Sequence, residues 1–292
     1  MFIEYLLYER NYSVHTLDAY MNDLLQFTSF IREKEISEGE SFGVERIDPD
    51  IVRLWMMDLM KQSLSSASVN RKLSALQSFF RYLIRQGIIA NFAFLSGPKK
   101  AKSLPYFVKE KEMEKILDEE NFGDDFNGIR NKLIIEMLYE TGLRCSELVG
   151  IKDVDVDIDA MLLKVTGKRN KQRLIPFADR LKEMIVYYIN VRAREIVVKS
   201  PSFFVRKDGR SVSPAIVYYI VKKNLSNIPT LSKRSPHVLR HTFATSMLND
   251  GAALSAIRNL LGHSSLASTS IYTHVTFEEL KKVYNAHPRA KK

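Results

Sequence analysis

The sequence predicts a mainly α-helical protein of the α+β class, with a helical N-terminal domain and a second, mostly helical domain that contains a small antiparallel β-sheet. Three observations support this prediction. Apolar residues recur at spacings of three and four along much of the chain, which is typical of amphipathic helices. Two short apolar-rich segments, MLLKVT and QRLIPF, flank the polar segment GKRNK, as the strands of a β-hairpin do. A stretch rich in Gly, Pro and Lys near residue 100 separates the two regions.

Three helices are predicted before this stretch, each from one stripe of apolar residues. The first runs on from Ser13 and presents Leu17, Tyr20, Leu24, Phe27 and Ile31. The second runs from about Pro49 to Met60, with Ile51, Leu54, Trp55 and Leu59 on its core side. The third runs from Ser66 to Gln86, with Val69, Leu73, Leu76, Phe80, Leu83 and Ile84. Residues 33–50, which are acidic and contain glycine, are predicted to form a long solvated loop.

The segment from Gly97 to Pro105 has the composition of an exposed linker, because it combines proline and glycine with several lysines. We therefore predict a domain at residues 1–98, a linker at 99–105 and a second domain at 106–292. In the second domain, helices are expected near residues 110–118, 128–140 and 145–150, and further helices from about 179 and 214.

The segment from Ser235 to Tyr272 gathers polar side chains that are suited to chemistry. Ser235 and Pro236 form a helix-start signature, and His237 and Arg240 then lie on one face of the first turns. The apolar stripe of this helix consists of Val238, Leu239, Phe243, Ala244, Met247 and Leu248, and Asn249-Asp250-Gly251 ends it. A second helix, roughly Leu254 to Leu261, stops at Gly262 and places His263 at a helix end, nine residues before Tyr272.

The composition limits the class of protein. The chain has 292 residues, of which 45% are hydrophobic and 27% charged, as in ordinary soluble globular proteins of two domains. The apolar runs are far shorter than a membrane span, and the first ten residues carry Glu4 and Glu9 where a signal peptide needs basic residues, so a cytoplasmic protein is expected. The single cysteine, Cys145, excludes an internal disulfide.

The charge favours a polyanionic partner, since the net charge is +10. Residues 1–98 hold 10 Lys or Arg and 12 Asp or Glu, so the excess lies in the second domain. Between Asp58 and Glu110, however, there is no acidic residue at all. This pattern favours contact with nucleic-acid phosphates over a merely solvated face. The predicted contact residues are Arg71, Lys72, Arg81 and Arg85.

Arginine and histidine donors can cluster round a phosphate, and a tyrosine hydroxyl is a competent nucleophile for phosphoryl transfer. Each of these residues taken singly also has an alternative role: a histidine is often a hydrogen-bonded structural residue, and a tyrosine is often a packing residue. The pair His237 and His241 has the spacing of half a zinc site, but the metalloprotease pattern needs Glu after the first histidine and this chain has Val238. No metal site is predicted.

The motifs HVLRH, LLGH and IYTH, in this order and spacing, resemble those of the tyrosine recombinase (phage integrase) family. The longer segments SPHVLRHTFAT, NLLGHSS and IYTHVTFEEL are similar to those of the bacterial Xer branch of that family. Upstream, TGLRCSELVGI at 141–151 resembles the first arginine box of the family, and TGKRNKQRLIP at 166–176 its catalytic-lysine hairpin. The resemblance covers essentially the whole chain and implies a core-binding, DNA-binding first domain followed by a catalytic domain.

The resemblance implies a role for each matched residue. Tyr272 is the nucleophile that attacks a DNA phosphodiester and forms a 3′-phosphotyrosyl link, which keeps the bond energy, so no cofactor is implied. Arg144 and Arg240 neutralise the phosphoryl transition state, His263 donates to a non-bridging oxygen, Lys168 protonates the departing 5′ oxygen and His237 assists proton transfer. Glu147 is expected to orient Arg144. Arg169 stands where related hairpins often have glycine, and Arg169 and Arg173 are expected to support DNA contact.

The resemblance also implies partners. It implies a tetramer on two double-stranded DNA duplexes with short bipartite sites, joined through a Holliday junction. The C-terminal segment YNAHPRAKK most resembles the XerC type. This resemblance implies a XerD-type second recombinase, chromosome dimer resolution at cell division and control by the septal DNA translocase. The tail from Phe277 to Lys292 is expected to form a helix that docks on a neighbouring subunit. The alternatives are a homotetramer, a DNA invertase or a mobile-element integrase, a tyrosine topoisomerase and a catalytically idle DNA-binding protein.

Overall fold

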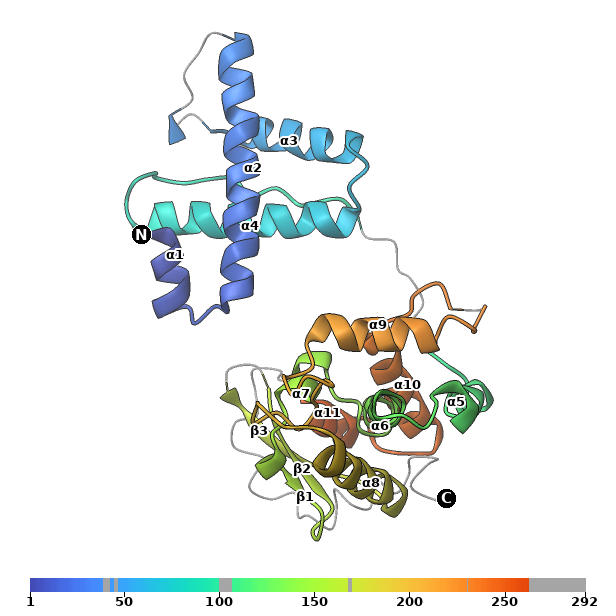
Figure 1. Ribbon diagram of the computed structural model, residues 1–292. Helices are drawn as coiled ribbons and strands as arrows, with labels where there is room; N and C mark the ends of the chain where they lie inside the picture. Colours follow the sequence, from blue (N-terminus) through green and yellow to red (C-terminus); the bar gives the residue numbers. More distant parts are fainter. Residues whose placement is uncertain (39–42, 45–46, 100–106, 168–169, 230, 263–292) are drawn as a thin grey trace. The chain divides into compact units, whose positions relative to one another are not determined.

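The computed structural model describes residues 1–38, 43–44, 47–99, 107–167, 170–229 and 231–262. The chain divides into two compact units, Met1–Ser103 and Leu104–Lys292. The first unit is helical and the second combines helices with one small antiparallel sheet (Figure 1), so the predicted mainly helical α+β fold is confirmed. In the described part of the chain, every helix is too short or too polar to cross a bilayer.

The helices of the first unit begin with the short α1 (Phe2–Glu4) and one π-helical turn, η1 (Tyr5–Glu9). They continue with α2 (Val14–Glu38), α3 (Pro49–Lys61) and α4 (Ser66–Arg85). Asp48 and Ser65 cap α3 and α4, since their side chains accept hydrogen bonds from the backbone N–H groups of Ile51 and Ser68. Figure 1 shows α2 crossing α3 and α4. The predicted helix starts are therefore correct.

The core of the first unit contains packed aromatic rings, between α2 and α3 and between α4 and the segment that follows it. The Phe27 and Trp55 rings meet edge to face at 4.9 Å, and the Phe80 and Phe92 rings stack at 3.9 Å. Of the predicted apolar stripes, α4 is correct, but on α3 Leu54 is 45% exposed and Val52 takes the buried position. The core side of α3 is thus rotated from the predicted one.

The predicted loop at residues 33–50 is wrong at its start, because α2 continues to Glu38. The residues concerned, EKEISE, are mostly strong helix formers, and the first glycine comes only at position 39. Local helix propensity therefore extends α2 to Glu38. The acidic composition that suggested a loop belongs to the C-terminal end of a helix.

The second unit opens with the helices that precede its sheet. These are α5 (Glu110–Ile116), the 3-10 turn η3 (Glu119–Asn121), α6 (Phe126–Thr141), α7 (Cys145–Gly150) and the 3-10 turn η4 (Asp153–Asp155). The sheet has the order β1-β2-β3 and consists of β1 (Val156–Asp157), β2 (Leu162–Thr166) and β3 (Gln172–Pro176). The helices after it are α8 (Asp179–Glu195), α9 (Pro214–Asn224), α10 (Pro236–Asn249) and α11 (Leu254–Leu261). The predicted hairpin and helices are present; β1 was not predicted.

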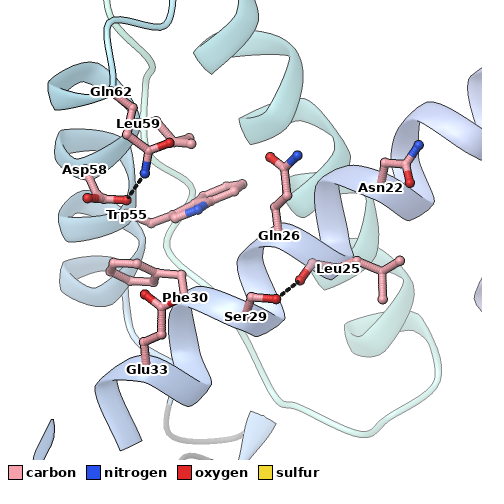
Figure 2. Close-up of a pocket in the computed structure, with 10 residues that line it drawn as sticks. All are labelled: Asn22, Leu25, Gln26, Ser29, Phe30, Glu33, Trp55, Asp58, Leu59 and Gln62. Atoms are coloured by element: carbon pink, nitrogen blue, oxygen red, sulfur yellow. Dashed lines mark hydrogen bonds between the residues drawn. The ribbon is translucent and has the colours of Figure 1, made fainter. Parts of the chain in front are cut away.

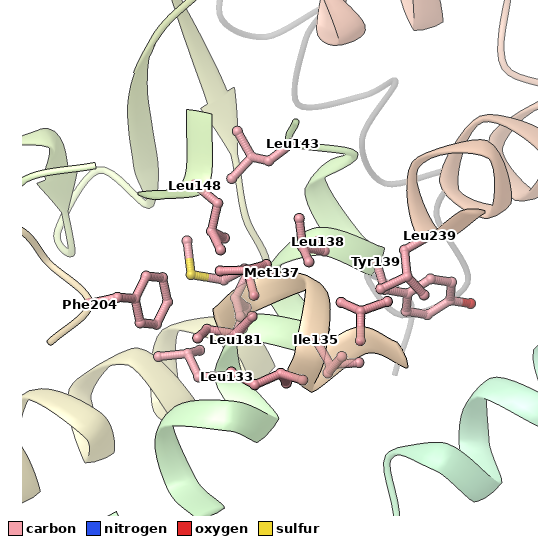
Figure 3. Close-up of a cluster of buried hydrophobic side chains, with 14 of the residues drawn as sticks. Leu133, Ile135, Met137, Leu138, Tyr139, Leu143, Leu148, Leu181, Phe204 and Leu239 are labelled. Atoms are coloured by element: carbon pink, nitrogen blue, oxygen red, sulfur yellow. The ribbon is translucent and has the colours of Figure 1, made fainter. Parts of the chain in front are cut away.

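Helix α6 is the centre of the second unit. Leu133, Ile134, Ile135, Met137 and Leu138 are all at most 1% exposed, so the helix has no solvated stripe. Figure 1 shows α6 end-on among its neighbours, and Figure 3 shows its side chains packed against Leu148, Leu181, Phe204 and Leu239 from four other segments. The turn that follows α6 is consequently anchored in the core.

The start of α10 fits the prediction in position only. Ser235 is the N-cap and Pro236 the first helical residue, but the Ser235 hydroxyl makes no capping hydrogen bond within the described chain. The helix is instead held by its buried stripe of Val238, Leu239, Phe243 and Met247, whereas Leu248, predicted to lie on this stripe, is 45% exposed.

Candidate active site

The turn between α6 and α7 presents Arg144. Gly142 ends α6 in the left-handed region with φ 61°, and a Cβ atom there would come within 2.5 Å of the Phe243 ring and 2.8 Å of Leu261, so glycine is required by conformation and by space. Arg144 then occupies the N-cap of α7, and its side chain is 32% exposed. The arginine therefore stands at the surface on a rigid, buried turn.

Glu147 holds Arg144 in place, as predicted. Its Oε2 accepts the backbone N–H of Arg144 at 2.8 Å, and its Oε1 accepts from Arg144 Nη1 at 2.7 Å. The carboxylate is 2% exposed. Burial by itself would raise the pKa of Glu147, but hydrogen bonds and charge from Arg173, together with bonds from Arg144, outweigh burial and lower the pKa to about 2. Glu147 is thus ionised at neutral pH.

Arg240 reaches the same carboxylate from α10. Its Nη1 donates to the carbonyl oxygen of Gly142 at 2.6 Å and its Nη2 to that of Leu261 at 2.5 Å, and Nη1 lies 3.9 Å from Glu147 Oε2. The two carbonyls belong to the C-terminal ends of α6 and α11, which carry partial negative charge. Burial lowers the pKa of Arg240 to about 10, with Arg144 contributing, and the guanidinium remains charged at neutral pH.

His237 lies one turn before Arg240 on the same helix and is exposed to solvent. Loss of part of its hydration lowers the pKa of His237, and the positive charges of Arg240, His241 and Arg144 lower it further. The imidazole is therefore neutral at neutral pH and able to accept a proton. The structure brings His237, Arg240 and Arg144 to one site, in which Glu147 bonds Arg144 and lies 3.9 Å from Arg240.

Arg173 also belongs to this site. We expected Arg173 to support DNA contact, but its side chain is only 11% exposed. It forms a bidentate ion pair in which Nη1 and Nη2 each donate to an oxygen of Glu147 at 2.9 Å. The strand register explains its orientation: Val165 pairs with Arg173 and Leu163 with Ile175, so Arg173 shares the buried face of the hairpin. Around one carboxylate, the site thus holds three guanidinium groups, two positive charges in excess.

Four of the predicted site residues, Lys168, Arg169, His263 and Tyr272, lie outside the described residues, as does the predicted tail helix from Phe277 to Lys292. The described chain reaches Gly167 on one side and Gly262 on the other, which immediately precede Lys168 and His263 in the sequence. The predicted linker at residues 99–105 also lies mostly outside the described residues.

The predicted basic face of α4 is divided by its tertiary contacts. Lys72 is 5% exposed and its ammonium lies 3.0 Å from Asp23 of α2, so Lys72 is a buried ion-pair partner and does not belong to an exposed face. Arg71 also bonds Asp23 but remains about half exposed. Arg85 pairs with Glu9 at 3.2 Å, and Arg81 stacks over the Phe94 ring at 4.8 Å. Arg71, Arg81 and Arg85 remain accessible.

A separate pocket of about 440 Å³ lies in the first unit between α2 and α3 (Figure 2). Its walls combine the Trp55 and Phe30 rings with the carboxylates of Glu33 and Asp58. The described lining contains no basic side chain, so the pocket is unsuited to phosphate and is not part of the site above.

Replacing Glu147 with glutamine is expected to lower the free energy of unfolding by about 3 kcal/mol at pH 7. The folded pKa of about 2 lies below the ordinary value of 4.5, so the carboxylate stabilises the folded state fully above pH 4.5, and this contribution is lost as the pH falls toward 2. Urea unfolding of both proteins between pH 7 and pH 3 measures the difference. A difference that is constant over that range would contradict the assignment.

Comparison with known proteins identifies the family. The sequence pattern of the phage integrase family matches residues 106–279, and that of the phage integrase N-terminal SAM-like domain matches residues 1–87. The chain is 39% identical to tyrosine recombinase XerC of Staphylococcus epidermidis, over 100% of this chain and 97% of the relative. It is 36% identical to tyrosine recombinase XerC of Anoxybacillus flavithermus, over 99% of this chain and 97% of the relative.

Solved structures share the fold. The XerH site-specific recombinase bound to a palindromic difH substrate matches with a TM-score of 0.73 at 23% identity, over 94% of this chain and 81% of that one. The Tn1549 transposon integrase in complex with transposon right end DNA matches with a TM-score of 0.67 at 18% identity, over 96% of each chain. The structures show the shared fold, and the full-length sequence matches show that the chain belongs to the phage integrase family and is a site-specific tyrosine recombinase of the XerC type.

Proposed function

We propose that this recombinase cuts and rejoins DNA with Tyr272 as nucleophile, on a phosphate bound by Arg144 and Arg240. The observation that carries the proposal is the cluster in which the buried Glu147 and helix-end carbonyls fix two arginines with positive charge in excess. A phosphoryl transition state carries spread negative charge, and catalysis consists mainly of placing donors around it. Guanidinium groups already fixed by the protein need little reorganisation when the phosphate arrives.

The proposed reaction is a transesterification. The Tyr272 oxygen bonds to phosphorus while the bond from phosphorus to the 5′ oxygen breaks, which leaves a 3′-phosphotyrosyl link and a 5′-hydroxyl. Neutral His237 assists removal of the tyrosine proton, and its lowered pKa supports this role. Lys168 protonates the departing 5′ oxygen, and His263 donates to a non-bridging oxygen; both roles follow from the family motif. Reversal with a 5′-hydroxyl from the other duplex rejoins the strands.

The partners proposed follow from the relatives. XerC is the name of curated relatives that match along the whole chain, and the XerH structure contains a difH substrate. We propose double-stranded DNA with a short bipartite site as substrate, and a tetramer with a XerD-type recombinase that resolves chromosome dimers through a Holliday junction under the septal DNA translocase. Residues 1–98 are proposed as the core-binding domain and 106–292 as the catalytic domain.

A nicked suicide substrate tests the proposed chemistry. Sequencing of DNA that is covalently trapped on the protein in cells first supplies the site. Cleavage of a nicked copy then releases a short fragment and prevents rejoining, so the protein accumulates as a covalent adduct. The expected result is an adduct whose DNA-linked peptide contains Tyr272. Attachment at another residue, or DNA that is bound at the trapped site without any adduct, would rule out the proposal.

The exposed arginines of α4 are proposed to contact DNA phosphates, and Arg81 is the clearest case because it lies in the acid-free stretch and stacks on Phe94. Arg81→Ala is expected to weaken binding and to reduce the slope of log affinity against log salt by about one. Arg53→Ala is a matched control, since Arg53 is an exposed arginine of the same unit that pairs with Asp50. Equal slopes for Arg81→Ala and the unaltered protein would mean that this face is merely solvated.

A further inference from the structure

Arg173 connects its own strand with two other segments at the centre of the site. Its Nε donates to the carbonyl oxygen of Leu260, in the last turn of α11, at 2.7 Å. Its Nη1 and Nη2 donate to the two oxygens of Glu147 on α7. Its own backbone belongs to β3 of the hairpin. All three nitrogen atoms of the guanidinium group are therefore engaged inside the protein.

The pair of Glu147 and Arg173 also lies against the backbone that precedes two proposed catalytic residues. A Cβ atom on Gly262 would come within 3.1 Å of Arg173 Nη1, and one on Gly167 would come within 3.3 Å of Glu147 Oε1. Gly167 immediately precedes Lys168, and Gly262 immediately precedes His263. The same carboxylate holds Arg144. The pair of Glu147 and Arg173 thus lies close to the backbone at Gly167 and Gly262, and it bonds Arg144.

We propose that Arg173 is a positioning residue for strand cleavage: paired with Glu147, it fixes the hairpin and the end of α11 relative to Arg144, without contacting DNA. The inference rests on the proposed function, because the hairpin matters for the reaction only if Lys168 acts there. Two features favour positioning over DNA contact: both Nη atoms of Arg173 pair with the Glu147 carboxylate at 2.9 Å, and Nε donates to the Leu260 carbonyl.

Arginine is needed at this position for a geometric reason. Its planar guanidinium group can meet both oxygens of a carboxylate and present a third donor, Nε, in a fixed direction. A lysine ammonium keeps the charge but cannot hold two carboxylate oxygens and the Leu260 carbonyl in that fixed geometry. The substitution Arg173→Lys therefore preserves the net charge of the site and removes the connection between the three segments.

The matched control is Arg192→Lys in the same unit. Arg192 is also buried, at 8% exposed, bonds both oxygens of Asp153 at 2.8 and 3.0 Å, and donates to the Phe203 carbonyl. Replacement with lysine therefore removes the same kind of two-oxygen carboxylate pair and carbonyl contact, but neither Asp153 nor Phe203 belongs to the site. Any general effect of an arginine-to-lysine change on folding appears in both variants.

The experiment measures single-turnover cleavage on two substrates, one with the natural 5′ oxygen at the scissile phosphate and one with sulfur there. Sulfur is a better leaving group and needs no general acid, so the ratio of the sulfur rate to the oxygen rate reports how well Lys168 is placed. Because both substrates meet the same folded fraction, this ratio does not depend on variant stability. Arg173→Lys is expected to slow oxygen cleavage about 100-fold and to raise the ratio about tenfold or more, with DNA affinity and salt slope unchanged.

Three results would overturn the inference. An unchanged sulfur-to-oxygen ratio in Arg173→Lys, or an equal rise in Arg192→Lys, would show no specific role in positioning. A loss of DNA affinity with a salt slope reduced by about one in Arg173→Gln, beside an unchanged slope in Arg173→Lys, would show a phosphate contact. Arg173→Gln also serves if the lysine variant does not fold, with the same rise in ratio expected. Lys168→Ala distinguishes a failure of the proposed function from a failure of the inference about Arg173. If the sulfur-to-oxygen ratio does not rise in Lys168→Ala, the role assigned to Lys168 is wrong.

Discussion

Tyr272→Phe is expected to abolish covalent attachment to DNA and all recombination. The change removes one hydroxyl group and leaves the ring, so packing volume and the net charge of the site are unchanged. Without the nucleophile, the remaining donors can bind and polarise the phosphate but cannot form the phosphotyrosyl bond. A fall in the cleavage rate on the order of 10⁶ is expected, as for removal of other catalytic nucleophiles. DNA affinity should stay within about twofold of that of the unaltered protein, since one hydroxyl contributes little to a phosphate-dominated interface.

The measurement uses the suicide substrate and denaturing gel electrophoresis, which separates the covalent adduct from free protein. Tyr219→Phe is a matched control because Tyr219 is a tyrosine of the same unit, on α9, and is 67% exposed. This control should form the adduct at the normal rate. An adduct that persists in Tyr272→Phe would exclude Tyr272 as nucleophile, whatever the effect on recombination.

Arg240→Ala is expected to have the next largest effect, a loss of cleavage of about 10³ to 10⁵-fold, the range reported for an arginine that stabilises a phosphoryl transition state. The structure gives a reason beyond charge. The guanidinium group is held by the carbonyl oxygens of Gly142 and Leu261, so its position is set before DNA binds. Removal also leaves two buried helix-end carbonyls without these donors, which is expected to cost about 1–3 kcal/mol of folding free energy for each.

Arg234→Ala separates the catalytic part of this effect from the structural part. Arg234 also donates to two backbone carbonyls, those of Leu225 at the end of α9 and of Ile228, but not to any residue of the site. Thermal unfolding and single-turnover cleavage are measured for both variants. Both should be less stable, and only Arg240→Ala should lose cleavage at a temperature where the two are folded. Similar cleavage rates for the two variants would contradict the assignment of Arg240 to the reaction.

The local elements could be predicted from sequence because their signals are local. The starts of α2, α3 and α4 follow from apolar spacing and from capping residues within three positions of the helix start. The hairpin of β2 and β3 follows from two short segments around GKRNK. Errors occurred where local rules compete: the acidic composition of residues 33–38 suggested a loop, whereas their helix propensity extended α2.

Charge pairing was the least predictable property, since it joins residues far apart in the chain. No acidic residue lies between positions 59 and 109, so the sequence predicted that the basic residues of α4 have no acidic partners. Asp23, on α2, forms ion pairs with both Arg71 and Lys72, and the burial of Lys72 removes it from the exposed face. The same holds in the second unit, where Glu147 serves Arg144 three residues away and Arg173 on a different element.

The mainly helical fold, the approximate positions of most elements and the family could be predicted from the sequence, because periodicity, turn residues and linked motifs are properties of the order of residues. Packing in three dimensions establishes the rest: Glu147 is buried and shared, Arg240 contacts the ends of α6 and α11, and Arg173 faces inward and joins three segments. The physical reason is that burial and ion pairing depend on distances in space. These are set by how the elements pack, and a pattern along one element does not contain them.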